Sequence, residues 1–283
     1  MNINDKEREF LYTQKDFEFL SQLATSNAGI KLPISKKELI YGRLSKRLRK
    51  LGLKSFKEYC QILEEDNNGE YSRFINAITT NVTHFFREMH HFRYLEETVL
   101  PEMVSSKQVS GNKKFRIWSA GCSSGEEAYS IAMVIRENLA DFMRWNVRIL
   151  ATDLDSEILA LAKRGVYPDQ KLEYISPERK IRWLEKVRIE EKPMVEINNH
   201  LKSFITFKQL NLIGDWPMKG PFDVIFCRNV TIYFDRDTRV FLLNRFADIL
   251  SDGGYLFVGH SESLHGITTR FKSVGQTIHK KIA

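Results

Sequence analysis

The sequence predicts an α/β protein in which a small all-helical domain precedes a doubly wound domain. Residues 1–90 show the spacing of apolar side chains that is typical of helices, and no strand alternation. Residues 115–120 predict a strand, which is followed by a turn of small residues and a helix. Further apolar strands are predicted at residues 147–153, 222–227 and 255–258. Strands that alternate with helices are typical of a parallel sheet that binds ligands where its strands end.

The helical domain is predicted to contain helices at residues 15–27, 41–53, 55–65 and 70–79. Gly29 and Gly52 are placed to end the first two, because glycine readily adopts the left-handed conformation that follows many helices. Asn67 and Asn68 predict a loop. Residues 105–114 are rich in Ser, Gly, Asn and Lys, so we expect residues 91–114 to be a linker between the domains.

The helix predicted at residues 41–53 is strongly basic. Leucines form one stripe of it, and the rest of its surface carries Arg43, Lys46, Arg47, Arg49 and Lys50. The formal net charge of the chain is +7 at pH 7. A solvated surface would explain these charges, but their concentration in one helix also suits an anionic partner. Nucleic acid, an acidic protein surface and membrane lipid are all open at this point.

Residues 79–88 combine polar and aromatic side chains. Thr83 and Arg87 are four residues apart, so they would share a face if this segment were helical. Asn81 or Thr83 could instead cap a helix, with Phe85 and Phe86 contributing to the core. Spacing alone does not separate a ligand site from a helix cap.

The turn after the strand at residues 115–120 indicates what kind of ligand the sheet binds. Gly121, Ser123 and Gly125 allow a sharp bend and a close approach of a ligand to the main chain. The next helix opens with Glu126 and Glu127, where a phosphate-binding site would favour an anion. Acidic residues there also complement the helix dipole, but no nearby basic residue offsets them. A ligand with a cationic end, such as S-adenosylmethionine, therefore fits better than a phosphate.

Two aspartates follow the second predicted strand. An acid at this strand end is well placed to accept hydrogen bonds from ribose hydroxyls. Asp153 stands 28 residues after Gly125, farther than the spacing of the dinucleotide fingerprint. Asp155 is better placed to cap the helix that follows. Asp153 is therefore the better ligand candidate.

The second half of the domain at residues 115–283 is predicted to hold an inserted antiparallel unit. Residues 176–187 predict a helix with proline at its first position. Residues 194–197 and 203–207 alternate with period two and predict a hairpin. We therefore expect a small β-subdomain at about residues 188–206.

The composition limits the class of protein. No apolar run has membrane-spanning length, and the first residues lack the basic-then-apolar order of a secretory signal. Cys60, Cys122 and Cys227 are widely spaced, which suits reduced thiols better than disulfides or structural zinc. The histidines show no ligand spacing, and adjacent His90 and His91 are expected to point to different faces of a helix. We expect a cytoplasmic protein without a metal site.

Five motifs in this order resemble the chemotaxis receptor glutamate O-methyltransferases, the CheR family, over nearly the whole chain. They are TTNVTHFFRE at 79–88, WSAGCSSGEE at 118–127, ATD at 151–153, NL at 211–212 and CRNVTIYF at 227–234. A lone glycine turn is weak evidence, but five pieces in family order behind a basic helical domain are specific. The resemblance implies a Rossmann-like methyltransferase domain that uses S-adenosylmethionine and releases S-adenosylhomocysteine. It implies glutamate carboxylates of chemoreceptors (methyl-accepting chemotaxis proteins) as acceptors.

The resemblance also implies site residues. Cofactor contacts would come from Asn81, Thr83, Arg87, Glu126, Glu127, Asp153, Asn211, Leu212, Arg228 and Asn229. Glu127, with Glu126, would face the methionine amino group, Asp153 the ribose, and Asn211 and Leu212 the adenine. Arg87 and Tyr233 would lie nearest the transferred methyl group. The basic helix would dock on receptor cytoplasmic domains through Arg43, Lys46, Arg47 and Arg49, recruiting the enzyme to membrane receptor arrays.

The chain departs from the family pattern at two places. Thr231 stands where members usually have an aliphatic residue, so packing beside Tyr233 is expected to differ. The predicted hairpin has no glycine in its loops, so we expect it not to tether the C-terminal peptide of a receptor. We also expect no nucleic-acid partner and no membrane insertion.

Two other functions are open from the sequence. A nucleic-acid methyltransferase would use the basic helix and the cofactor site together, but residues 228–231 lack the Asn/Asp-Pro-Pro-aromatic motif of base methylation. A non-catalytic S-adenosylmethionine-binding adaptor would bind cofactor and receptor without turnover. A nicotinamide dehydrogenase is disfavoured by the two glutamates and the glycine spacing.

Overall fold

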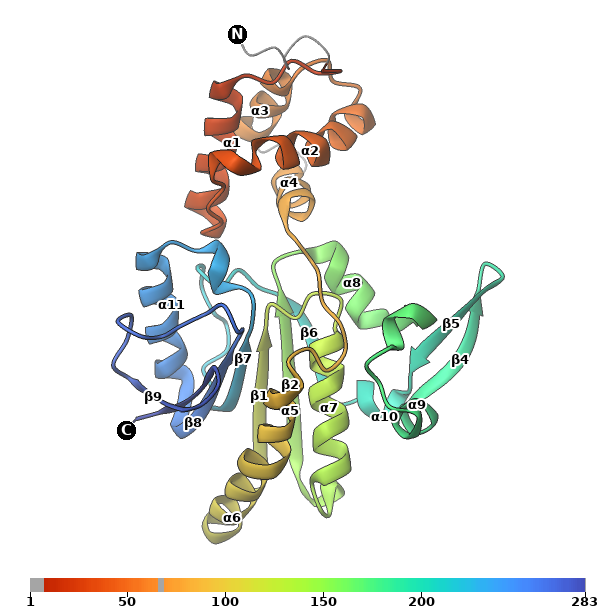
Figure 1. Cartoon of the computed structure of the whole chain (residues 1–283), viewed down its shortest axis with the longest axis vertical. Helices are drawn as coiled ribbons and strands as arrows, with labels where there is room; N and C mark the ends of the chain where they lie inside the picture. Colours follow the sequence, from red (N-terminus) through yellow and green to blue (C-terminus); the bar gives the residue numbers. More distant parts are fainter. Residues whose placement is uncertain (1–7, 66–68, 283) are drawn as a thin grey trace.

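The computed structural model describes residues 8–65 and 69–282. The first seven residues of the expected helical domain, Asn67 and Asn68 of the expected loop, and Ala283 lie outside the described residues. Figure 1 shows a helical bundle that stands at one end of a large sheet, with a small second sheet at its side.

The bundle consists of α1 (Gln14–Ala28), α2 (Lys37–Leu51), α3 (Phe56–Glu65) and α4 (Glu70–Ile78), with a short 3₁₀ turn, η2 (Ile34–Lys36). A capping box at Thr13 and Asp16 starts α1, and Gly29 ends it at φ 68°. Gly52 ends α2 in the same way, at φ 69°. The apolar faces of these helices meet in a hydrophobic cluster made almost wholly of bundle residues. The predicted helical domain is therefore a unit with its own core.

The large sheet has seven strands in the order β6-β2-β1-β7-β8-β10-β9. The strands are β1 (Lys114–Ala120), β2 (Asn146–Asp153), β6 (Ile205–Gln209), β7 (Phe222–Cys227), β8 (Leu250–Val258), β9 (Phe271–Gly275) and β10 (Ile278–Lys281). The first five in this order pair in parallel, and β10 pairs antiparallel with both β8 and β9. The chain moves outward from β1 to β2 and β6, then returns to the other side of β1 with β7. The strand order therefore reverses beside β1, which is where doubly wound sheets bind ligands.

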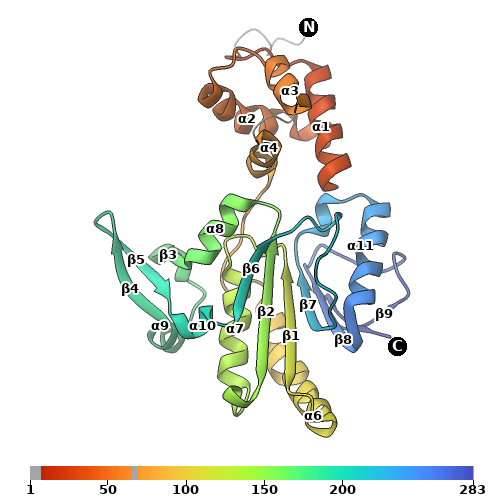
Figure 2. The ribbon, with the colours of Figure 1, turned by 180° about the vertical axis from the view of Figure 1, so that it is seen from behind.

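Helices cover both faces of the sheet, as Figures 1 and 2 show from opposite sides. These helices are α5 (Met89–Tyr94), α6 (Leu100–Ser110), α7 (Glu126–Asn138), α8 (Ser156–Arg164) and α11 (Arg236–Ile249). Side chains of β1 point alternately to the two faces of the sheet. Phe115 and Ile117 belong to the hydrophobic cluster that includes residues of α5 and α7, whereas Trp118 belongs to the cluster that includes residues of α11. The sheet is thus buried on both faces, as expected for parallel strands.

The expected linker at residues 91–114 is wrong. Most of this segment forms α5, a π-helical turn η3 (Leu95–Val99) and α6, and β1 begins at Lys114. Phe92, Leu95 and Val99 are buried in the core beneath the sheet. The Ser- and Lys-rich composition at residues 105–114 reflects the solvent side of α6 and its end at Gly111, where φ is 68°.

The inserted antiparallel unit exists but has other boundaries than expected. Its sheet has the order β3-β5-β4, formed by β3 (Val166–Pro168), β4 (Leu184–Ile189) and β5 (Lys192–Ile197). The helix predicted to run to residue 187 is α9 (Pro177–Trp183), and β4 starts immediately after it. Residues 203–207 do not return to the hairpin. After α10 (Asn199–Lys202) they lead into β6, the edge strand of the large sheet, because period-two alternation does not say which strand is the partner.

The hairpin between β4 and β5 turns without glycine. Glu190 and Glu191 both adopt left-handed backbone conformations, at φ 47° and 61°. Such two-residue turns match the twist of a hairpin and normally carry Asn-Gly. The missing glycine therefore did not prevent a complete hairpin, whose strands are six residues long each.

Candidate functional site

A pocket lies between the bundle and the carboxyl ends of β1, β2, β6 and β7. Its bundle side includes Ala28, Ile30, Leu32, Lys36 and Ile40, and residues 78–83 and Arg87 form a further wall. The residues that the sequence placed at the site and that line this pocket are Asn81, Thr83, Arg87, Glu127, Asp153, Asn211, Leu212, Arg228, Asn229 and Tyr233. Residues from five distant motifs therefore meet in one place.

The turn after β1 makes room for the pocket. Gly121 has φ 84°, and a Cβ atom there would come within 2.4 Å of the Val230 side chain. The backbone N–H groups of Gly121 and Cys122 both donate to the Thr152 carbonyl, at 2.8 Å each. The turn is thus tied to β2 and packed against the loop after β7, and glycine is required by both the φ angle and the contact.

The two glutamates that open α7 behave differently. Glu127 lines the pocket, accepts from the Ser119 hydroxyl at 2.7 Å and from Arg228 Nη1 at 3.0 Å. Burial raises the pKa of Glu127 against the opposing effect of Arg228. Glu126 is not part of the lining that the described residues form: it is fully buried, accepts from Ser124 Oγ at 2.5 Å and pairs with Lys171 Nζ at 3.0 Å.

The expectation that Glu126 contacts the cofactor is therefore wrong for this arrangement. Neighbouring residues of a helix point about 100° apart, so only one of the two side chains faces the pocket. Glu126 instead joins α7 to Lys171, whose ammonium also donates to the Thr83 carbonyl at 3.2 Å. Glu126 thus supports the pocket wall from behind.

The two aspartates at the end of β2 lie in different surroundings. Asp153 lines the pocket and accepts from the backbone N–H groups of Ser123 at 2.7 Å and Asp155 at 3.0 Å. Burial raises the pKa of Asp153 to about 6. Asp155 caps α8 by accepting from the N–H groups of Glu157 and Ile158. Its other oxygen accepts from Asn81 Nδ2 at 2.8 Å, which fixes Asn81 at the rim of the pocket.

Residues 79–88 form no helix, and neither Asn81 nor Thr83 caps one. The segment is irregular, and α5 begins only at Met89. Arg87 stands between Phe86 and Glu88, which both have left-handed backbones at φ 53° and 58°. Its guanidinium donates to the Val82 carbonyl at 2.9 Å, so Thr83 and Arg87 share the pocket through a loop and not through a helical face.

The loop after β7 is held by an acid that sequence reasoning missed. Glu262 is 5% exposed and accepts from the backbone N–H groups of Asn229 at 2.7 Å, Val230 at 2.9 Å and Thr231 at 2.6 Å. It also accepts from the N–H of Gly259 at 2.5 Å and from the Thr231 hydroxyl at 2.8 Å. Thr231, the expected departure in packing, is thus a hydrogen-bond donor. No spacing signal connects Glu262 to a loop that lies 31 residues earlier.

Near Asn211 and Tyr233, hydrogen bonds join the bundle to the loops that follow the strands. Asn211 donates from Nδ2 to the Asn27 carbonyl at 2.7 Å, and the Tyr233 carbonyl accepts from the N–H of Lys31 at 2.9 Å. The Lys36 ammonium lies 5.1 Å from the centre of the Tyr233 ring. Lys36, which the sequence did not single out, therefore places a bundle cation next to the expected catalytic tyrosine.

The basic helix is less available to a partner than its sequence indicated. Arg43 donates to the carbonyls of Ile78 at 2.6 Å and Thr79 at 2.8 Å, which fastens α2 to the pocket wall. Arg47 forms a two-pronged pair with buried Glu70. At the surface, Arg49 pairs with Glu9 at 2.6 Å, and the side chains of Lys46 and Lys50 are exposed. Arg43 and Arg47 therefore have structural roles, and Lys46, Arg49 and Lys50 form the outward basic face.

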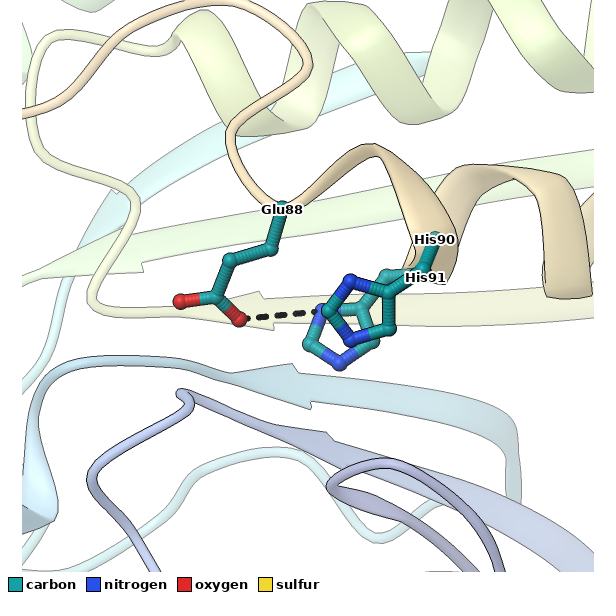
Figure 3. Close-up of side chains that lie close together, drawn as sticks. All are labelled: Glu88, His90 and His91. Atoms are coloured by element: carbon teal, nitrogen blue, oxygen red, sulfur yellow. Dashed lines mark ion pairs between the residues drawn. The ribbon is translucent and has the colours of Figure 1, made fainter.

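His90 and His91 converge instead of pointing apart. Their ring centres lie 4.1 Å from each other, and Figure 3 shows both rings on the side of Glu88. Single ligand atoms of Glu88, His90 and His91 lie within 4.8 Å of one another.

Within the described part of the chain, no helix is long and apolar enough to cross a membrane.

Comparisons with known proteins agree with this geometry. Residues 15–79 match the all-alpha domain of CheR methyltransferases, and residues 81–280 match their SAM binding domain. A probable chemotaxis protein methyltransferase of Rhizobium etli is 42% identical over 257 residues, covering 90% of this chain and 95% of the relative. The chemotaxis protein methyltransferase of Escherichia coli is 40% identical, covering 93% and 89%. Chemotaxis protein methyltransferase 2 of Pseudomonas aeruginosa is 40% identical, covering 96% and 95%. The chain belongs to the CheR methyltransferase family.

Proposed function

We propose that this protein transfers a methyl group from S-adenosylmethionine to glutamate side-chain carboxylates of chemoreceptors. The observation that carries the proposal is the charge pattern of the pocket. Glu127 and Asp153 line one part of it, and Arg87, Lys36 and Tyr233 line another. A cationic methyl donor and an anionic acceptor thus each find a complementary region in one pocket.

The residues present fit S-adenosylmethionine. The Glu127 carboxylate would hold the ammonium of its methionine part, and Asp153 would accept hydrogen bonds from the ribose. Leu212 is 8% exposed and, with Asn211, would hold the adenine. Gly121 lines the pocket, and its φ of 84° gives the sharp turn that brings the main chain to the ligand. Bound S-adenosylmethionine supplies an electrophilic methyl group on a sulfonium centre.

The protein's part in the reaction is placement. A glutamate carboxylate has an ordinary pKa of about 4.3, so it is ionised at neutral pH and needs no general base. Arg87 would orient it through two parallel hydrogen bonds, and the Tyr233 hydroxyl would donate one more. Correct placement of two reactants contributes about 7–11 kcal/mol at best. The ester product is neutral, so it would lose its attraction to these cations and leave.

The bundle would present the acceptor to the pocket. We propose the bundle, which ends with α4, as the receptor-docking part, and residues 115–283 together with α5, η3 and α6 as the methyltransferase part. Lys46, Arg49 and Lys50 would meet an acidic surface of the receptor's methylation helices, and docking there would recruit the protein to receptor arrays. The inserted sheet has β4 at one edge, and the expectation that it does not tether a receptor peptide stays a prediction.

The direct test is transfer of radiolabelled methyl from S-adenosylmethionine to purified chemoreceptor cytoplasmic fragments. Alkali-labile label that disappears when the acceptor glutamates are changed to alanine would establish carboxyl methylation. Binding of the donor without label on any receptor would refute the proposal and leave the adaptor. Deleting the C-terminal peptide of the receptor is expected to leave the rate unchanged.

Two variants test the catalytic assignment. Arg87→Ala is expected to lower turnover about 100-fold or more, because the acceptor loses its orienting cation. Tyr233→Phe removes one hydrogen bond and is expected to cost about 10-fold, or about 1.4 kcal/mol. Single-turnover label transfer at saturating donor and receptor measures both. Full activity in both variants would remove these roles.

A further inference from the structure

The backbone around Arg87 is strained on both sides. Phe86 and Glu88 have φ 53° and 58°, in a region that side chains other than glycine rarely enter. Such a residue is strained and persists only where the surroundings hold it. The Phe86 side of the turn is held by packing, because Phe86 is 3% exposed and its N–H donates to Ser130 Oγ at 3.0 Å.

The Glu88 side of the turn is held by charge. The Glu88 side chain is 12% exposed, and its Oε2 lies 3.3 Å from Arg228 Nη2 and 3.4 Å from His91 Nδ1. Its Oε1 accepts from His260 twice, from Nδ1 at 3.1 Å and from the backbone N–H at 3.3 Å. Figure 3 shows the carboxylate reaching from the start of α5 toward the two histidine rings. Burial alone would raise the pKa of Glu88, but Arg228 and His260 lower it overall.

The same arginine holds the peptide of Arg87. Arg228 donates from Nη2 to the Arg87 carbonyl and from Nη1 to Glu127 Oε2 at 3.0 Å. Its side chain is only 2% exposed, so this guanidinium is fixed between two carboxylates and one carbonyl. The chain of contacts Glu127–Arg228–Glu88 therefore runs from the pocket to the strained turn. Without Glu88, Arg228 would lose one of its two carboxylate partners, and the strained turn would lose its contacts with Arg228 and His260.

A metal ion is the other explanation for this cluster. Glu88 Oε2, His90 Nε2 and His91 Nδ1 are buried and accept or donate no hydrogen bond within the described chain. However, the Arg228 guanidinium already lies against the same Glu88 oxygen, and a divalent cation there would face its positive charge. Burial and Arg228 lower the pKa of His91 to about 3, so His91 adds no positive charge of its own. The carboxylate is thus matched by the arginine without a metal.

We propose that Glu88 is a positioning residue that clamps the strained turn so that the Arg87 guanidinium faces the pocket. This inference rests on the proposed function, because Arg87 acts there on the acceptor. Glu88 itself is not among the pocket-lining residues that the structure describes. Glu88 also touches Arg228, which lines the pocket. With the donor saturating, a weaker donor contact of Arg228 does not limit turnover, so the effect of Glu88 on methyl transfer is then expected to pass through Arg87.

A double-mutant cycle tests this dependence. Glu88→Ala is expected to lower turnover by about 10- to 100-fold, the size of effect that a small misplacement of a reacting group produces. In the Arg87→Ala background the same change is expected to cost less than about twofold, because there is no side chain left to position. Glu97→Ala, an exposed acid of the same helical segment, is the matched control and should leave turnover unchanged. Equal losses from Glu88→Ala in both backgrounds would overturn the inference.

A chemical probe separates this inference from the proposed function. Phenylglyoxal modifies accessible arginines, and peptide mass mapping gives the extent at Arg87, with exposed Arg93 as internal reference. Glu88→Ala is expected to raise the relative labelling of Arg87 at least threefold, even if the acceptor is not a chemoreceptor. Unchanged labelling would overturn the clamp. Zinc bound stoichiometrically by the parent protein and lost in Glu88→Ala would overturn it in favour of a metal site.

Discussion

Replacing Glu262 by glutamine is expected to destabilise the methyltransferase part strongly, although the two side chains have the same shape. One carboxylate oxygen accepts from the N–H groups of Asn229 and Gly259. The other accepts from the N–H groups of Val230 and Thr231 and from the Thr231 hydroxyl. Whichever way the amide is turned, its NH₂ group faces two backbone donors.

The cost follows from those two donors. A buried donor left without an acceptor costs about 1–3 kcal/mol, so two give about 2–6 kcal/mol. Asn229 and Val230 line the pocket, so the same change is expected to weaken cofactor binding. Thr231→Val removes a single hydroxyl donor and is expected to cost about 1 kcal/mol, because Glu262 keeps its four backbone donors.

Urea unfolding followed by tryptophan fluorescence measures these losses. The chain has 4 tryptophans, and the bundle contains none of them, so fluorescence reports on the methyltransferase part. Glu173→Gln, at an exposed site, is the control for a glutamate-to-glutamine change. A loss below about 1 kcal/mol in Glu262→Gln would refute the reasoning, since it would mean that the loop does not depend on this carboxylate.

Three further variants test the pocket and the bundle. Asp153 has a pKa of about 6, so its carboxylate is about nine-tenths protonated at pH 5. The Kd for S-adenosylhomocysteine, measured by calorimetry, should therefore rise about tenfold from pH 7.5 to pH 5. In Asp153→Asn the Kd should not change with pH over this range. The free energy of unfolding changes with pH in the opposite direction to ligand affinity. Because the pKa of Asp153 is raised in the folded state, the stability that its protonated carboxyl contributes is lost as pH rises through about 6. Arg47→Ala leaves buried Glu70 without its two-pronged partner and should cost the bundle about 3 kcal/mol. Arg49→Ala breaks an exposed pair and should leave the melting temperature nearly unchanged. Thermal circular dichroism measures both, and similar small losses would contradict the structural role of Arg47.

The pocket could be predicted from the sequence because it depends on strand ends. Parallel strands bring their carboxyl ends to one edge of a sheet, so residues that follow different strands meet there. Glu127, Asp153 and Arg228 are of this kind, and each lies where its strand end places it. The choice between Glu126 and Glu127 was not predictable, because it depends on the rotation of α7 about its axis.

The errors concern partners that are distant in sequence. The Ser- and Lys-rich composition of residues 105–114 led us to predict a linker where helices are found. The apolar residues of these helices are recognisable as core residues only from their packing against the sheet. The strand at residues 205–209 pairs with β2, more than 50 residues earlier, although its neighbour in sequence is the hairpin. The contacts of Arg43 and Arg47 within the protein were not foreseen, because their acceptors, backbone carbonyls near residue 79 and the carboxylate of Glu70, lie 23–36 residues away. Local patterns carry no information on such contacts.

The pocket is lined by residues of both the bundle and the sheet, so substitutions in one part affect the site that it shares with the other. Ala28, Ile30, Leu32 and Lys36 line a site whose other walls belong to the sheet. A ligand that binds only when the two parts are in contact therefore stabilises that contact, by RT ln(1 + c/Kd) at a free ligand concentration c. A chimaera that takes its bundle from a relative with another receptor would inherit a new pocket wall together with the new docking surface. Receptor choice and donor affinity would then change together, and a natural exchange of bundles would need compensating substitutions at the strand ends.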